Sequence, residues 1–279
     1  ADPSAVGSGK TALTTLMHEA GHAAHFSNIL QRSPLFSQER APTSVAYAEN
    51  QSMFLDSLVS DAAWRARYAR DRSGKVLPWA LHEQSLRATA PYDVFQLRSM
   101  LAVPYFEKAL YELPDSELTP QKVAKLADEI ELRIVGGMSP RPLLSVPHIL
   151  SDESSCYYHS YVLAEMSVYQ TRDHFGGASN IVDNPAVGEA LAEVYWKPGN
   201  SKPFLDLVRE LTGKPLSADA WLDHLKEDLE TKIDSEKNDY HEAVVLTKAK
   251  VDLKMRMLIK DGDDLIADSD ADGEFLATC

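Results

Sequence analysis

Two histidines and a glutamate near the start of the sequence have the spacing of a metal-dependent hydrolase site. His18, Glu19 and His22 stand in the run His-Glu-Ala-Gly-His. Residues four apart lie on one face of a helix, so the two imidazoles can bind one metal ion while Glu19 points toward the water beside it. The pattern predicts zinc-dependent hydrolysis, with Glu19 as the group that takes a proton from water.

A zinc hydrolase site needs a third protein ligand and leaves a fourth position for water. Glu49 lies in the predicted helical stretch Ser44–Asp56, among small and apolar neighbours where an unpaired charge is costly. Asp56, one helical face further along, is the alternative third ligand. We predict that His18, His22 and Glu49 hold one Zn²⁺ per chain.

Helices must position these residues, and the apolar spacing predicts them along most of the chain. One helix over Thr11–Asn28 places both histidines in its middle. Further helices are predicted over Leu55–Asp71, Trp79–Thr89, Tyr92–Glu112 and Pro120–Leu132, and a charge-laced helical pattern runs from Ala220 to Lys260. Strand signals are scarce. The sequence therefore predicts an all-α fold.

The stretch from His18 to His25, followed by Glu49, resembles the thimet-oligopeptidase and oligoendopeptidase family of zinc peptidases. The site of that family has the pattern HExGHxxH, with a glutamate on the next long helix. Gly21 and His25 therefore match the family at positions that the general zinc motif HExxH leaves open. The resemblance implies a multi-helix, zincin-type catalytic domain with little β structure. It also implies zinc as the cofactor and short peptides as substrates, with His25 in a supporting or structural role.

A second stretch, from His148 to Glu165, is similar to the family's substrate loop, in which a histidine precedes a cluster of tyrosines that opens a helix. The resemblance implies that His148 and either Tyr158 or Tyr161 donate hydrogen bonds to the oxyanion of the transition state. The spacing after His148 is one residue longer than in the family, so the choice of tyrosine stays open. Tyr157 is assigned to substrate binding. Without the resemblance, the three tyrosines read as amphipathic packing residues.

Two further segments carry weaker signals. The breaker-rich stretch Ile134–Pro142 contains Gly136 and Gly137, which would let a peptide substrate approach the backbone; the alternative is a plain connection between helices. The segment from Gly188 to Trp221 is similar to the family's closing turns and helices. Its expected role is structural.

The chain departs from the family at its start. In members of the family, an extended N-terminal half precedes the zinc helix, whereas in this chain the predicted zinc helix begins at Thr11. We expect a catalytic domain over residues 11–225 that lacks the N-terminal half of the family's substrate channel, with that half as a possible separate partner. Residues 1–10 are expected to be a flexible lead or a vector-derived remnant, 226–260 a charged helical extension, and 261–279 an acidic, poorly ordered tail.

The net charge and the cysteine content limit which classes of partner and which cellular compartment we expect. The net charge of −14, from 28 basic and 42 acidic residues, argues against nucleic acid and anionic membrane surfaces as partners. Two cysteines, Cys156 and Cys279, make no disulfide framework and fit a reducing compartment. We expect the cytoplasm or an organellar lumen such as that of the mitochondrion.

Two alternative functions remain open at this point. A chain with half a channel can bind peptides or a partner without cleaving them, and an all-α zinc hydrolase can act on something other than peptides.

Two other sequence motifs are present only in part. Residues Gly7–Thr11 lack the first glycine of a phosphate loop, and a calcium loop starting at Asp268 would have Cys279 where it needs a glutamate.

Overall fold

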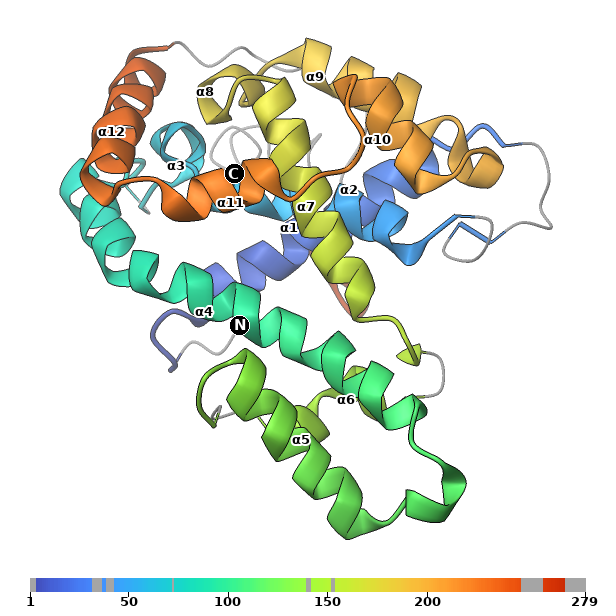
Figure 1. Ribbon diagram of the computed structural model, residues 1–279. Coiled ribbons are helices and arrows are strands. Elements are labelled where there is room, and N and C mark those ends of the chain that lie inside the picture. The colour runs from blue at the N-terminus through green and yellow to red at the C-terminus, as the bar shows by residue number, and fades with distance from the viewer. Residues whose placement is uncertain are drawn as a thin grey trace.

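The computed structural model describes residues 4–31, 37–38, 43–71, 73–138, 142–151, 154–246 and 258–268, and these are almost entirely helical (Figure 1). The helices are α1 Ser8–Ser27, α2 Val45–Ser57, α3 Ala62–Tyr68, α4 Trp79–Tyr111, α5 Pro120–Ile134, α6 Pro147–Leu150, α7 His159–His174, α8 Ala178–Ile181, α9 Pro185–Leu191, α10 Phe204–Thr212, α11 Asp219–Lys226 and α12 Leu229–Val245. Strands β1 Leu258–Asp261 and β2 Asp264–Asp268 form an antiparallel hairpin. The predicted all-α fold is confirmed.

None of the helices in the described part of the chain is both long enough and apolar enough to cross a bilayer.

Helices α1 and α2 approach each other backbone to backbone at Gly21. A Cβ atom at this position would lie 2.6 Å from the carbonyl oxygen of Gln51 and 2.6 Å from the Cα of Ser52. Both separations are far inside van der Waals contact, so only glycine allows the two helices to lie this close. The contact brings the histidine face of α1 against the middle of α2.

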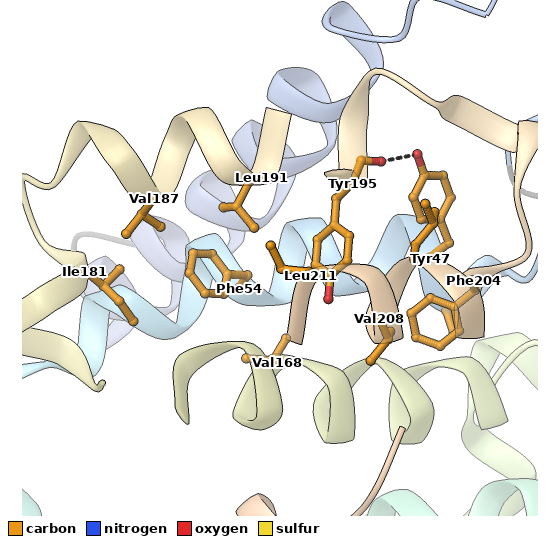
Figure 2. Packing of buried hydrophobic residues seen from close by; sticks show 12 residues of the cluster. Tyr47, Phe54, Val168, Ile181, Val187, Leu191, Tyr195, Phe204, Val208 and Leu211 are labelled. Carbon is orange, nitrogen blue, oxygen red and sulfur yellow. Dashed lines mark hydrogen bonds between the residues drawn. The ribbon is translucent and has the colours of Figure 1, made fainter. Parts of the chain in front are cut away.

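The other side of α2 packs into the largest apolar core, shown in Figure 2. Tyr47 and Phe54 of α2 lie against Val168 of α7 and Leu207 of α10, and all four are almost completely buried. The hydroxyl of Tyr47 donates a hydrogen bond to the backbone carbonyl of Tyr195 (Figure 2). Helix α2 is therefore held on one side by this core and on the other by α1.

The described part of the chain has two smaller cores. Helices α4 and α5 pack together around Phe106 and Ile130, with Leu143 and Val146 beside them. Helix α12 packs on α3 through Tyr240 and a row of alanines. In Figure 1 the long helix α4 runs from the region of α12 to that of α5 and α6, so it joins these two parts of the molecule.

The structure corrects the helix boundaries around α4. The two predicted helices, Trp79–Thr89 and Tyr92–Glu112, form one continuous helix with Pro91 and Pro104 inside it. An internal proline removes a hydrogen bond and typically costs about 3 kcal/mol. Contacts of α4 with α12, α7 and α5 along its length outweigh this local preference.

Both ends of the chain also differ from the predicted organisation. The expected flexible lead is already helical from Ser8. The expected C-terminal helix ends at Val245, and Leu258 to Lys260 belong to a strand. A tight turn at Gly262, whose φ is 58°, closes the hairpin and replaces the start of the predicted tail. Residues 269–279 lie outside the described part.

We predict that Gly21→Ala lowers the free energy of unfolding by about 1–3 kcal/mol or more, because the new methyl group must separate two backbones. Gly9→Ala in the same helix is the control. Its Cβ would meet nothing within 4 Å, so we expect it to be neutral or to stabilise the helix by up to about 1 kcal/mol. Urea unfolding of both variants measures the difference, and equal effects would contradict the proposed steric role.

Candidate active site

His18, His22 and Glu49 converge at the contact between α1 and α2. One ligand atom from each lies within 4.8 Å of the others, and no other such group of His, Cys, Asp or Glu was found among the described residues. The Nε2 atoms of His18 and His22 lie 3.3 Å and 3.7 Å from Oε2 of Glu49. The three predicted ligands are therefore close enough together to bind one metal ion.

Asp56, the alternative third ligand, has a different position. Its Oδ2 lies 2.9 Å from Nδ1 of His18, on the side of the ring away from Glu49. When one ring nitrogen of a histidine binds a metal, a carboxylate that accepts a hydrogen bond from the other ring nitrogen fixes the orientation and the tautomer of the ring. Asp56 thus supports His18, and Glu49 is the carboxylate that faces both histidines.

The electrostatics of the cluster also favour a cation. Burial lowers the pKa of His18, but hydrogen bonds to Asp56 and Glu49 outweigh this effect and raise the pKa to about 10. Burial raises the pKa of Glu49, but hydrogen bonds to His18 and Tyr157 hold that pKa below its usual range. In the metal-free protein at neutral pH, a protonated His18 therefore lies beside two carboxylates, and a bound metal ion would replace its Nε2 proton.

His25 and Glu19 occupy opposite kinds of environment on α1. His25 is fully buried, and its ring lies edge-on to that of Tyr47 at a centroid distance of 4.5 Å. Burial, with a smaller contribution from His22, lowers the pKa of His25 to about 3, so the ring is neutral. Its position in the core agrees with the expected structural role. Glu19 is exposed.

The predicted substrate loop lies beside this cluster although it is about a hundred residues away in sequence. The hydroxyl of Tyr157 donates a 2.5 Å hydrogen bond to Oε1 of Glu49. Nε2 of His148 lies 3.2 Å from the hydroxyl of Tyr161, and the ring of Tyr158 packs edge-on against His148. Burial and the charge of Glu49 raise the pKa of Tyr161, which keeps it a hydrogen-bond donor. The tertiary structure therefore unites the two predicted halves of the site.

Gly136 has a local structural explanation. Its φ is 91°, a conformation that favours glycine, and its N–H closes the end of α5 on the carbonyl of Leu132 at 3.1 Å. Arg98 of α4 donates a hydrogen bond to the neighbouring carbonyl of Ile134. These contacts are those of a helix ending. The predicted contact of Gly136 and Gly137 with substrate is a separate hypothesis.

Comparison with known proteins places this geometry in a family. The model of Peptidase family M3 matches residues 9–227, which include all of α1 except Ser8, together with α2 and the tyrosine loop. The chain belongs to family M3. A solved structure named BsuCP is similar to this M3 chain with a TM-score of 0.56 and 19% sequence identity, over 82% of this chain. The match covers 49% of BsuCP, so the chain spans about half the length of that structure. No curated protein matches the chain.

Sequence reasoning missed Glu165, which belongs to the surroundings of the M3 site. This α7 carboxyl interacts electrostatically with Asp56. Burial and the negative charge of Asp56 raise the pKa of Glu165 to about 7, while Arg172 opposes the rise. The residue stands in the tyrosine-rich stretch, but only the packing of α7 on α2 places it near Asp56.

We predict that Asp56→Ala weakens Zn²⁺ binding by the M3 chain about 10- to 100-fold, because His18 loses the partner that orients its ring. Competition with a chromogenic chelator measures the affinity. Asp128→Ala, an exposed position on α5, is the control and should bind as the wild type does. Unchanged affinity in Asp56→Ala would remove the supporting role of this carboxylate.

We predict a pH-dependent effect for Glu165→Gln. The folded-state pKa near 7 lies above the ordinary value of 4.5, so the stability that the neutral carboxyl provides is present below pH 4.5 and is lost as pH rises through 7. Relative to the wild type, the variant should therefore gain about 1–3 kcal/mol between pH 5 and pH 8, since Glu165 is only partly buried. Urea unfolding at both pH values tests this, and exposed Glu129→Gln should show no such gain.

Proposed function

We propose that this chain is the catalytic part of a zinc-dependent peptidase that hydrolyses peptide bonds in short peptides. The observation that carries the proposal is the convergence of His18, His22 and Glu49 within 4.8 Å, inside the segment that matches family M3. Two imidazoles and one carboxylate are a ligand set of zinc hydrolases, which keep the fourth position for water.

The bonding of His22 also fits a metal ion. Its Nδ1 is buried without a hydrogen-bond partner among the described groups, and its Nε2 lies 3.7 Å from Glu49, beyond hydrogen-bond distance. A metal ion between the two histidines and Glu49 would supply a partner for Nε2, the nitrogen that faces Glu49.

A bound Zn²⁺ ion would polarise the peptide carbonyl and make water a stronger nucleophile at neutral pH. In the proposed reaction, Glu19 takes a proton from the attacking water and passes it to the leaving amine. The hydroxyl of Tyr161 or Tyr158, together with His148, donates hydrogen bonds to the oxygen on which negative charge develops. Tyr161 is favoured because His148 lies within hydrogen-bond distance of its hydroxyl.

The substrate class rests on the family and on the site surroundings. We propose short peptides, with Tyr157, Gly136 and Gly137 as contacts for the peptide. Because the structural match covers 49% of BsuCP, we also propose that a further polypeptide segment completes the channel. A cytoplasmic or organellar location is part of the same hypothesis.

A second candidate function follows from the same length comparison. A chain that spans about half of a similar structure can bind peptides, or a partner, without orienting them for cleavage. Leu16, two positions before His18, is 65% exposed and offers an apolar contact for such a partner. This candidate is a metal-binding fragment without turnover.

We predict that Glu19→Gln retains one Zn²⁺ per chain but lowers cleavage of a quenched fluorescent peptide about 10²- to 10⁴-fold, because the proton acceptor is lost. His22→Ala should lose the metal itself. Metal content by mass spectrometry and the peptide assay separate the two effects. Exposed Glu129→Gln is the control for both measurements.

The outcomes distinguish the candidate functions. Full activity in Glu19→Gln would exclude its role as the proton acceptor, and unchanged zinc content in His22→Ala would overturn the ligand assignment. Zinc binding by the wild type without peptide cleavage would favour the binding fragment or a non-peptide substrate. Cleavage that begins only when a companion fragment is added would indicate a split peptidase.

A further inference from the structure

The two oxygens of the Glu49 carboxylate have different partners. Oε2 lies 3.3 Å from His18 and accepts a 3.1 Å hydrogen bond from the hydroxyl of Ser52. Oε1 accepts the 2.5 Å hydrogen bond from Tyr157. The residue is only 2% exposed, so water competes little for either oxygen. The carboxylate is therefore held so that one oxygen faces the histidines and the other is occupied by the phenol.

The backbone around Tyr157 is held in place from α4. The N–H of Cys156 donates a 2.8 Å hydrogen bond to Oε1 of Glu107, which is 3% exposed. Cys156 has a φ of 57°, so the chain turns sharply just before Tyr157. On the other side, the carbonyl of Tyr157 accepts the N–H of Ser160 at 2.9 Å, at the start of α7. The direction of the phenol is therefore set by contacts with two helices.

We propose that Tyr157 is a positioning residue that makes Glu49 a one-oxygen metal ligand, and that it thereby couples the tyrosine loop to the metal site. This inference rests on the proposed zinc site. A carboxylate can bind a metal through one or both oxygens. With Oε1 hydrogen-bonded to Tyr157, only Oε2 is directed toward the histidines, and one coordination position is left for water and substrate.

The inference gives Tyr157 a role that a simple contact with substrate would not have. Loss of its hydroxyl frees Oε1 of Glu49 in a buried site where water is scarce. The freed Oε1 can then bind the metal beside Oε2, in competition with the hydroxyl of Tyr161, which also hydrogen-bonds Glu49. Two imidazole nitrogens, two carboxylate oxygens and the water then make five ligands in place of four. Substrate binding alone would leave the metal coordination unchanged.

The test compares Tyr157→Phe with Tyr240→Phe in the full chain. Tyr240 is a matched control because its hydroxyl also makes one hydrogen bond, to the carbonyl of Leu77 at 2.8 Å, in the separate core of α3 and α12. Both proteins are loaded with Co²⁺, whose visible absorption is strong in four-coordinate sites and weak at higher coordination numbers. Zn²⁺ affinity is measured by chelator competition.

We expect Tyr157→Phe to lose most of the four-coordinate Co²⁺ absorption and to change its Zn²⁺ affinity about 10-fold, whereas Tyr240→Phe matches the wild type. An unchanged Co²⁺ spectrum in Tyr157→Phe overturns the inference, even where affinity, kcat or KM has changed. If the wild type binds no metal, the proposed function fails as well. If the wild type binds metal and the two variants have the same spectrum, only the role of Tyr157 fails.

Discussion

The close contact between α1 and α2 at Gly21 is the constraint on which the rest of the site depends. Two histidines come from one helix and a glutamate from the other, so the distance between the helices sets the size of the ligand cluster. With no side chain at Gly21, the backbone of α1 rests on Gln51 and Ser52. Any larger residue would separate the imidazoles from Glu49. The large core on the far side of α2 packs this helix against the rest of the molecule.

Around the cluster, Glu49 and Asp56 each have a hydrogen-bonding partner. Glu49 is paired with His18 and Tyr157, and Asp56 is paired with the outer nitrogen of His18. Glu165 has no histidine partner among the described residues, and burial, followed by the negative charge of Asp56, raises its pKa. The concentration of negative charge favours a cation at the centre, because a metal ion offsets repulsion that the protein would otherwise retain.

The sequence was a good guide wherever the relevant residues are near one another in the chain. The HExGHxxH run on a proline-free apolar stretch predicted a helix that begins within a few residues of the observed one. Local rules failed for α4, where Pro91 predicted a break. Continuous contacts with α12, α7 and α5 outweigh the lost hydrogen bond there, and the sequence does not record such contacts.

Residue types and spacing alone determined the candidate ligand set of this M3 chain: two imidazoles one helical turn apart, an acid beside them and a glutamate on the next helix. Only the tertiary structure decided what surrounds these groups. It placed Asp56 behind His18, directed Tyr157 to the second oxygen of Glu49, and brought His148 to Tyr161. The physical reason is that helical periodicity fixes which side chains share a face, whereas the partner of that face depends on how distant segments pack.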